Sequence, residues 1–464
     1  MINKSSRRVF LAGVGAGAAL TLRAQNRKTF DVKDYGAAGD GKTLDTEAIQ
    51  KAIDAAGAAG KGAQVLLRGG KKYLVGTLLL RSGIDFHLAD DAELVVSTNP
   101  AHYPNALDAG ILTARGARDL KISGTGNIAG RAKEFMTRYD QEGEIWEFGN
   151  FRPKVFILAA CQGLEISGIS FSEAPFWGLH MLGCEHVLVD GLKVRNLLDV
   201  PNCDGIDPDH CRDVEIRKCD IVCGDDGIVV KTTRQPLPYG QSANIKVRDC
   251  IIETKDSGLK IGTETTDDIH DILFERCEIK SSCRGLTIQL RDEGSVYGVE
   301  FKDIKFTARY QAAPWWGRGE GISVTAMPRT QGSKLGTIHD IKFTNVTGRA
   351  ENSSRIVGTR ENRIRNITMD HVSLTMTRTT KYPGGVYDNR PTTAYPEIQP
   401  HPTPAFYFKE ADKVTLTDCK VAWGPNPPTY YTHALEAEHT TGVVPTRFTG
   451  VAAHPKRDIA VTIR

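Results

Sequence analysis

The chain has 464 residues, enough for a large core, two ordinary domains or one extended repeat domain. Its 46 glycines and 7% aromatic residues favour a turn-rich strand architecture over a helical one. The formal net charge of +3 depends on the first 24 residues, which hold four of the 59 Lys and Arg; without them, 55 basic residues stand against 56 acidic ones. Charge therefore gives no reason to expect a nucleic-acid partner.

Residues 1–24 are expected to be an export signal. The sequence SRRVFL at residues 6–11 precedes a run rich in Ala and Gly that ends at Leu22 and contains no acid. This pattern resembles a twin-arginine signal, which predicts a periplasmic or extracellular protein whose mature domain spans residues 25–464. No other run is long and apolar enough to span a membrane, so we expect no membrane contact after cleavage.

One helix is predicted near the N-terminus. A short strand at residues 30–32 and a Gly-rich turn come first, and residues 46–59 then carry apolar side chains at helical spacing. Asp45 is the expected N-cap and Gly60 the expected stop. A single amphipathic helix before a long β region predicts a cap over the exposed end of a stack of strands.

From about residue 63 the chain consists of short apolar alternations, and a motif begins to repeat. It has apolar residues at its first and third positions and another five after the first. Most intervals are about 23–31 residues, and longer ones after Val299 and Ile367 leave room for insertions. The first positions are Leu164, Val187, Val214, Ile245, Ile272, Val299, Ile341, Ile367 and Val414.

Cysteine takes part in this repeat as an apolar residue. Five positions after each motif start, Cys219, Cys250, Cys277 and Cys419 alternate with Ile, Leu and Val. We therefore expect a buried stack rather than disulfides among these four. No Cys-x-x-Cys pair exists, which argues against a structural zinc site. The pattern leaves open the state of the other six, Cys161, Cys184, Cys203, Cys211, Cys223 and Cys283.

The equivalent positions of successive repeats form a column, and the motif above gives the first. A second column also recurs once per repeat: a glycine is followed by two apolar residues that flank one variable residue. A coil of this length with strands in each turn is an all-β, parallel β-helix. Parallel strands stack about 4.8 Å apart, so equivalent side chains form a ladder. The residue before each Gly is in turn Trp177, Asp204, Asp226, Ser257, Arg284 and Glu320; the outward-pointing residues are His180, Asp207, Val229, Lys260, Thr287 and Ser323.

Three carboxylates meet on two adjacent turns of this ladder: Asp204, Asp225 and Asp226. Like charges placed so closely raise the pKa of at least one of them. One protonated acid beside ionised partners is what glycosidic bond cleavage requires, since an acid protonates the leaving oxygen and a base activates water. Asp-Gly pairs are common in turns and acidic clusters bind Ca²⁺, but three carboxylates in register favour catalysis.

At these residues the chain resembles the polygalacturonase-type glycoside hydrolases of family 28. NCDGID at residues 202–207 is similar to their NTDG(I/F)D motif, and Gly224-Asp225-Asp226 matches their GDD motif. The resemblance spans roughly Asp31 to Thr347. It implies a right-handed parallel β-helix, a pectic poly- or oligosaccharide substrate of galacturonan or rhamnogalacturonan type, no metal or cofactor, and an inverting mechanism. By resemblance Asp225 is the general acid, and Asp204 and Asp226 position and activate the water.

The chain departs from the family where a uronate would be held. Ser257 stands in place of the His of the family's GHG motif, and Thr287 and Gln289 replace the two bases of its RIK motif. Lys260, Arg284 or Arg291 could supply a carboxylate contact instead. Alternatively, the cleaved residue is neutral, the substrate is a branched pectin, or catalysis is altered.

Further side chains are candidates for sugar contacts. They are Asn202 beside the first acid, His180 one turn earlier, and Trp316 with Glu320 in the insertion after Phe306. The Pro- and Thr-rich stretch from Tyr382 to Pro404 is predicted to be a long loop near the cleft. Two other functions stay open: a Ca²⁺-dependent polysaccharide lyase, and a β-helix that binds carbohydrate without cleaving it.

Overall fold

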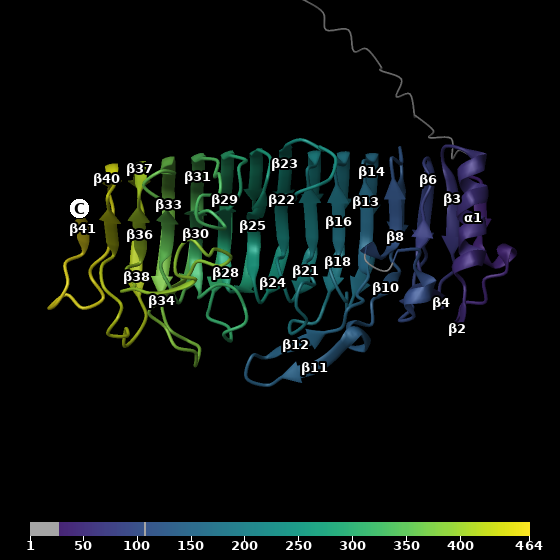
Figure 1. Ribbon diagram of the computed structural model, residues 1–464, viewed down its shortest axis with the longest axis horizontal. Helices are drawn as coiled ribbons and strands as arrows, with labels where there is room; N and C mark the ends of the chain where they lie inside the picture. The colour runs from purple at the N-terminus through teal and green to yellow at the C-terminus, as the bar shows by residue number, and fades with distance from the viewer. Residues whose placement is uncertain (1–26, 106–107) are drawn as a thin grey trace, which may run out of the picture.

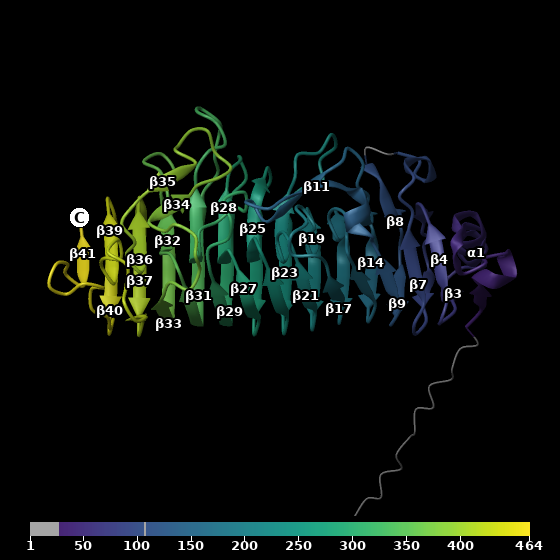
Figure 2. The ribbon, with the colours of Figure 1, turned by 90° about the horizontal axis from the view of Figure 1, so that it is seen from below.

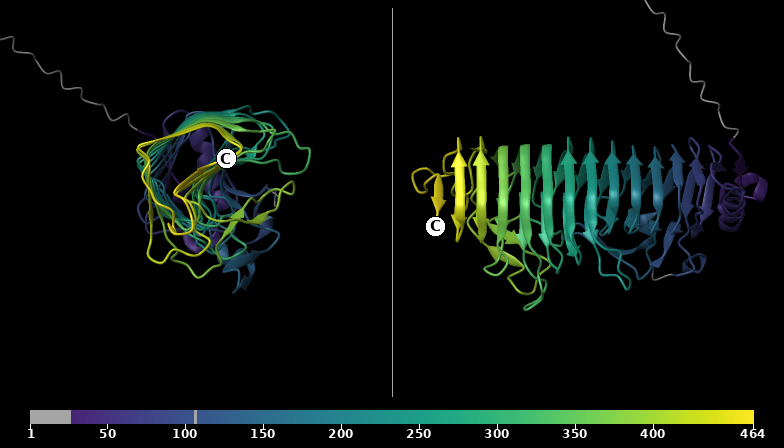
Figure 3. Two further views of the ribbon diagram at one scale, coloured as in Figure 1. Left: turned by 90° about the vertical axis from the view of Figure 1, so that its left-hand side faces the viewer. Right: turned by 90° about the horizontal axis from the view of Figure 1, so that it is seen from above.

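The computed structural model describes residues 27–105 and 108–464, so the predicted export signal lies outside the described residues. The chain is a right-handed parallel β-helix whose turns stack along one axis, as predicted (Figure 1). Figure 3 shows the strands as parallel rungs from above and the turns superposed along the axis. A 24-stranded sheet carries the first repeat column, and a 13-stranded sheet carries the second.

The first turns form the narrow N-terminal end of the coil. Parallel pairs join β1 to β3, β3 to β6 and β6 to β9, while β2, β4 and β7 form a neighbouring row. These strands are β1 (Thr29–Asp31), β2 (Asp40–Leu44), β3 (Ala63–Leu67), β4 (Lys72–Val75), β5 (Leu78–Leu79), β6 (Ile84–Leu88), β7 (Glu93–Val96), β8 (Gly110–Arg115), β9 (Lys121–Gly124) and β10 (Asn127–Ala129).

Helix α1 (Thr46–Ala59) has the predicted bounds and lies across the N-terminal end of the coil (Figure 1). It buries Ile49, Ile53 and neighbouring alanines against the first strands. Asp45 is the N-cap residue, but its side chain makes no bond to the helix. Its carboxylate instead accepts from the backbone N–H groups of Ala38 and Gly39, at 2.7 and 3.0 Å. Asp45 therefore fastens the Gly-rich turn to the start of the helix.

The first repeat column has the predicted register. Leu164 pairs with Val187, Val187 with Val214, and so on without a slip to Val414. The strands are β14 (Gln162–Ser167), β17 (Glu185–Asp190), β20 (Arg212–Arg217), β23 (Ser242–Arg248), β26 (Ile269–Glu275), β29 (Val296–Ala308), β31 (Ile338–Ala350), β33 (Ile364–Met376) and β37 (Ala411–Thr417), and the column continues at Val443 in β40 (Thr441–Thr446).

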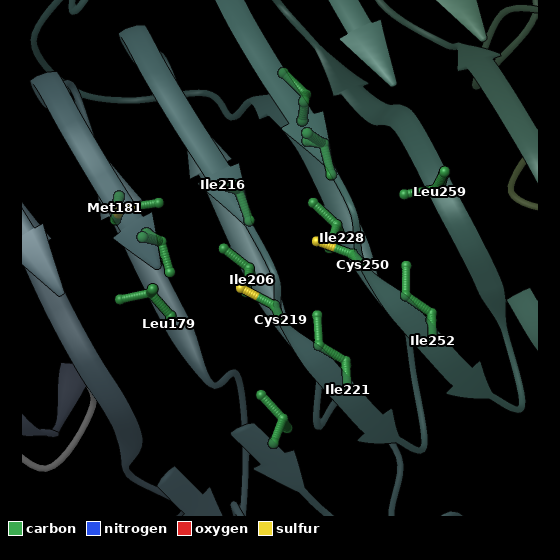
Figure 4. Packing of buried hydrophobic residues seen from close by; sticks show 14 of the residues in the cluster. Leu179, Met181, Ile206, Ile216, Cys219, Ile221, Ile228, Cys250, Ile252 and Leu259 are labelled. Atoms are coloured by element: carbon green, nitrogen blue, oxygen red, sulfur yellow. The ribbon is translucent and has the colours of Figure 1, made fainter. Parts of the chain in front are cut away.

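The cysteines fill the interior as small apolar residues. Cys219 and Cys250 lie in the core between the sheets, beside Ile221 and Ile252 (Figure 4). All ten cysteines are buried and free, which confirms the prediction for the four in the repeat and settles the other six in the same way. The core forms one continuous cluster along the coil. Its stability therefore comes from stacked side chains between neighbouring turns.

The second column forms the 13-stranded sheet, again in the predicted register. His180 pairs with Asp207, Lys260 with Thr287, and Thr287 with Ser323. The central strands are β13 (Lys154–Ala159), β16 (Leu179–Leu182), β19 (Ile206–Asp209), β22 (Ile228–Thr232), β25 (Ser257–Thr265), β28 (Arg284–Leu290), β30 (Glu320–Ala326) and β32 (Ser354–Val357). The sheet continues through β36 (Phe406–Lys409) and β39 (Leu435–Glu438) to β41 (Val461–Ile463).

Short strands of the 24-stranded sheet complete the turns around the site. They are β15 (Ser170–Ser172), β18 (Lys193–Arg195), β21 (Asp220–Cys223), β24 (Ile251–Thr254), β27 (Glu278–Ser282) and β38 (Lys420–Trp423). None of the described helices is long and apolar enough to cross a membrane.

Two excursions leave the coil on the same side of the molecule (Figure 2). One is an antiparallel hairpin of β11 (Met136–Asp140) and β12 (Ile145–Phe148), which the repeat pattern did not predict. The other lies within the stretch predicted as a long loop: β34 (Val386–Asp388) and β35 (Ile398–Pro400) pair there in antiparallel fashion. The prediction was thus wrong for six residues of that stretch, because a two-stranded ribbon shows no repeat to neighbouring turns.

Candidate active site

Asp204, Asp225 and Asp226 meet at the entrance to two adjacent strands. Asp204 lies two residues before β19, and Asp225 and Asp226 precede β22. One carboxylate oxygen of each lies within 4.8 Å of the others. The glycine after each ladder position is required by close packing, since a Cβ on Gly205 would collide with the Gly227 carbonyl. The Asp-Gly pairs thus belong to the stacking of turns as well as to the acidic site.

The carboxylate of Asp225 is held by backbone donors. The N–H of Asn202 donates to Asp225 Oδ2 at 3.1 Å, and the N–H of Asp226 donates to Asp225 Oδ1 at 2.8 Å. Arg152 supports this arrangement from outside the repeat. Its guanidinium donates to the Asn202 side chain at 3.0 Å and to the Pro201 carbonyl at 2.9 Å, and it stacks on Phe148. Burial lowers the pKa of Arg152 to about 10, so it remains charged at neutral pH.

Two buried lysines supply positive charge to the acids. Lys231 Nζ lies 3.3 Å from Asp204 Oδ2 and 3.0 Å from Asp207 Oδ1, and 3.9 Å from the ring centre of Trp177. Lys260 Nζ lies 2.7 Å from Asp226 Oδ2. Burial alone lowers the pKa of each ammonium, but the carboxylates outweigh it and hold both pKa values above the ordinary range. Both lysines are therefore protonated at neutral pH.

The acids themselves hold protons more tightly than ordinary aspartates. Burial and the charge of Asp207 raise the pKa of Asp204 well above its ordinary value, against the opposing effect of Lys231. Burial and Asp226 raise the pKa of Asp225, which Lys260 opposes. Burial with Asp226 and Asp225 raises the pKa of a fourth carboxyl, Asp256, to about 8. Such a group of unequal carboxyls can keep one proton while another member is ionised.

These residues open into a cavity of about 460 Å³, a size typical of small-molecule sites. Its floor is the acidic cluster with Lys231 and Lys260. Its walls are apolar or aromatic and come from several excursions: Ile145 and Phe148 of β12, Pro314 to Trp316, and Pro391. Trp177, Pro201, Asn202, Asp256, Thr263, Glu264 and Arg329 complete the lining. Aromatic walls over polar groups suit a sugar, which has both apolar faces and hydroxyls.

Three of the predicted substrate-contacting residues line this cavity: Asn202, Lys260 and Trp316. His180 lies one turn away from it, where its Nδ1 is 3.3 Å from Lys154 Nζ and its Nε2 is 3.2 Å from Asp209 Oδ2. Ser257 is fully buried and donates to Asp256 Oδ1 at 2.9 Å. His180 and Ser257 thus stand behind residues that are nearer the cavity.

The other four predicted residues, Arg284, Thr287, Gln289 and Glu320, are fully buried and line no part of the cavity. The segment around β34 covers two of them: Gln289 Nε2 donates to the Arg390 carbonyl at 3.1 Å, and Arg284 donates to the Asp388 carbonyl at 3.1 Å. Asp388 accepts from Arg390 Nη2 at 2.6 Å and lies 3.4 Å from Arg318, and the chain thus places a carboxylate of its own among these cations.

Sequence reasoning missed several residues around the cluster. Arg152 and the β11–β12 hairpin lie outside the repeat columns, and Arg329 follows the last strand of the site. Asp256 was visible, since it precedes Ser257 as Asp225 precedes Asp226. Lys231 was also visible as the outward residue that pairs with Asp209 one turn earlier.

Two groups of side chains have the spacing to hold a metal ion among the described residues. One is the Asp204, Asp225 and Asp226 cluster, and the other is Asp370, His371 and Asp418 on the opposite sheet. In the first group, Lys231 and Lys260 already provide the counter-charges within ion-pair distance. In the second, His371 and Arg447 both lie close to acids of the group.

Comparison with known proteins identifies the family of the chain. A family model, described as glycosyl hydrolases family 28, matches residues 71–386, which is more than half of the chain and contains the acidic cluster. The chain belongs to glycosyl hydrolases family 28. A second model, rhamnogalacturonase A/epimerase, pectate lyase-like, matches residues 29–87 at the N-terminal end of the coil.

Relatives of this family 28 protein include plant and bacterial proteins. A probable polygalacturonase from Vitis vinifera is 28% identical over 305 residues, 62% of this chain and 61% of that protein. An exopolygalacturonase from Zea mays is 24% identical over 368 residues, 75% of this chain and 83% of that one. The chain thus spans about three fifths of the length of the first of these.

Solved structures show the same fold at low identity. The exopolygalacturonase of Thermotoga maritima has a TM-score of 0.63 at 20% identity, with 75% of this chain and 87% of that chain covered. The family 28 exopolygalacturonase of Yersinia enterocolitica has a TM-score of 0.65 at 19% identity, with 90% and 78% covered.

Proposed function

We propose that the protein is an exported hydrolase that cleaves a glycosidic bond in a pectic poly- or oligosaccharide of galacturonan or rhamnogalacturonan type. The observation that carries this proposal is the group of three carboxylates, Asp204, Asp225 and Asp226, within 4.8 Å of one another on the floor of a sugar-sized cavity. Residues 25–464 are proposed to act as one domain, and residues 1–24 as a twin-arginine-type signal.

The surroundings of the acids support different roles for them. Asp225 has a raised pKa and two backbone donors that fix its orientation, which suits a general acid that protonates the leaving oxygen. Asp204 lies 3.3 Å from the Lys231 ammonium, which opposes the rise in its pKa, and Asp226 lies 2.7 Å from the Lys260 ammonium. An ionised carboxylate within reach of water acts as the base that removes a proton as water attacks the sugar.

The stereochemical outcome is open to direct measurement. The family resemblance implies inversion, for which the acid and base carboxyls are usually about 6.5–9.5 Å apart. The oxygen separations in this cluster are shorter, within 4.8 Å. Because these are distances between single oxygens and not between the carboxyl groups, inversion rests here on the resemblance. The anomer that appears first in NMR spectra of the reaction decides between the two.

The charges in the cavity bear on which sugar is bound. All three cations that line it already have acidic partners: Lys231 with Asp204, Lys260 with Asp226, and Arg329 with Asp292 at 2.7 Å. The two family bases are replaced by Thr287 and Gln289, which are covered. These features favour a substrate whose sugar at the cleaved bond is neutral, as in a branched or alternating pectin, over an unsubstituted galacturonan.

The test is a panel of pectic polymers and oligosaccharides with product analysis by mass and NMR. Hydrolysis adds one water per bond, and Asp225→Asn lowers kcat by about 10²–10⁴-fold while thermal unfolding is unchanged. Asp220→Asn is the matched control, because Asp220 pairs with Arg195 on the other sheet. Near-full activity of Asp225→Asn would contradict the assignment. An unsaturated product that absorbs ultraviolet light and is lost on chelation would indicate a lyase, and saturable binding without product would indicate a binding protein.

A further inference from the structure

The tip of the β11–β12 hairpin contacts two chain segments that lie next to residues of the cavity. Glu144 Oε1 lies 2.9 Å from Lys381 Nζ, and Glu144 Oε2 accepts from the Tyr382 hydroxyl at 2.8 Å. The backbone carbonyl of Glu144 accepts from Lys255 Nζ at 3.2 Å. Lys255 directly precedes Asp256 in the site, and Lys381 and Tyr382 begin the segment that leads to β34. The hairpin tip therefore joins the residue before Asp256 to the segment that leads to β34.

The hairpin is also fixed at its base and beside its tip. The N–H of Trp146 donates to the Asp199 carbonyl at 2.9 Å, and Arg152 stacks on Phe148. At the tip, the Gly143 backbone lies against Pro314, since a Cβ added to Gly143 would meet Pro314 Cγ at 2.8 Å. Pro314 belongs to the loop whose tryptophans line the cavity. The hairpin is thus tied down along its length and does not hang free in solvent.

Glu144 has a left-handed backbone, as many other turn residues of the chain do. Its φ is 50°, a left-handed conformation in which Gly is the usual hairpin residue. A residue with a Cβ is strained there. The three contacts of Glu144 offset this strain. We call the contacts of Glu144 with Lys381, Tyr382 and Lys255 the latch. Lys381 and Tyr382 lower the pKa of Glu144, so the latch is charged at neutral pH.

We propose that Glu144 determines specificity by latching the hairpin across the cleft, so that the site accepts an end of a pectic chain and excludes its interior. The C-terminal side of the cleft is filled by the Asp388 segment over Arg284 and Gln289, and Ile145 and Phe148 line the wall on the hairpin side. With the latch closed, the interior of a polymer would meet the Asp388 segment on one side and the hairpin on the other. This inference rests on the proposed hydrolase function.

The variant Glu144→Gly tests the latch with little risk to folding, because glycine relieves the left-handed backbone. The pair Lys381→Ala and Tyr382→Phe opens the same latch from the opposite wall. With the substrate from the panel in polymer form, the wild type is expected to release one short product while viscosity falls slowly. Both latch variants are expected to lower viscosity several-fold faster per bond cleaved and to release a series of product lengths.

Glu147→Ala is the matched control, since Glu147 bonds only Arg138 within the hairpin. It should keep the wild-type product pattern. A wild type that lowers viscosity rapidly and yields random lengths would overturn the latch and leave the hydrolase intact. A latch variant that keeps the single product, with unchanged thermal unfolding, would also overturn it. Absence of any cleavage on the whole panel would instead refute the proposed function on which the latch depends.

Discussion

Lys260 Nζ lies 2.7 Å from Asp226 Oδ2, and both side chains are about 5% exposed. The two residues occupy neighbouring turns, one at the ladder position before the glycine and the other on the outward face. The pair is therefore a product of the coil register. It also sets the charge of the acidic cluster, because Lys260 lowers the pKa values of Asp225 and Asp256 while it pairs with Asp226.

We expect Lys260→Met to change both stability and the pH profile. Removing one partner of a buried ion pair costs about 3 kcal/mol in the free energy of unfolding, measured by urea titration. Asp225 must be protonated to act as an acid, so activity falls as pH rises through its pKa. Loss of the ammonium raises that pKa, and the alkaline limb of kcat against pH moves upward. Lys246→Met is the control, because Lys246 is exposed, and it should change neither the stability nor the pH profile. If the alkaline limb of kcat against pH does not move in Lys260→Met, Asp225 is not the acid.

Asp256 makes stability depend on pH. Burial with Asp226 and Asp225 raises its pKa from 3.8 to about 8 in the folded chain. Between these values the folded state holds a proton that the unfolded state releases, so its contribution to stability is present below about pH 4 and is lost as pH rises toward 8. Relative to wild type, Asp256→Asn should gain up to about 1.4 kcal/mol per pH unit between pH 5 and 7. If the free energies of unfolding of the wild type and Asp256→Asn change in parallel with pH, Asp256 is ionised in the folded state.

Arg152 acts on catalysis through Asn202. Without its fork to Pro201 and Asn202, the backbone donor to Asp225 is released, and Arg152→Ala should lower kcat/KM by about 10²-fold, mainly in kcat. Arg152→Lys keeps the charge but not the two-armed geometry, so it should recover only part of the loss. Arg138→Ala, in the hairpin, is the control. If the Arg152 variants lose thermal stability in proportion to their loss of activity, the role of Arg152 is structural alone.

The free cysteines predict that the stability of the protein does not depend on a reducing agent. All ten thiols are free and buried, so the midpoint of thermal unfolding should be the same with and without a reducing agent. Thiol titration of the unfolded chain without reductant should count ten groups, and the folded chain should react slowly. A count of eight or fewer would reveal disulfides.

The repeat columns could be predicted from the sequence, because residues separated by one turn of the coil lie next to each other in the structure. Val187 and Val214 are 27 residues apart and hold equivalent positions in the repeat, and such equivalent residues meet on adjacent strands. The same logic brought Asp204 to Asp226. Cysteine could be placed in the core because it shares a column with Ile and Val.

Features without a periodic signal could not be read in this way. The β11–β12 hairpin pairs with itself, so no neighbouring turn repeats its pattern. Thr287 and Gln289 occupy outward-facing positions in β28, and only the segment near Arg390, about a hundred residues later, determines that they are covered. Asp45 satisfied the rule for a helix cap but uses its carboxylate on the preceding turn, since two N–H groups there lie closer to it.

The latch between Glu144 and Lys381 joins residues 237 positions apart in a fold built from contacts between adjacent turns. Such a chain can form turn by turn, and contacts between distant segments come late because their loops must close first. The three aspartates therefore come together before the pocket around them is complete. On this order of folding, the proposed selectivity for chain ends is acquired after the proposed capacity for cleavage.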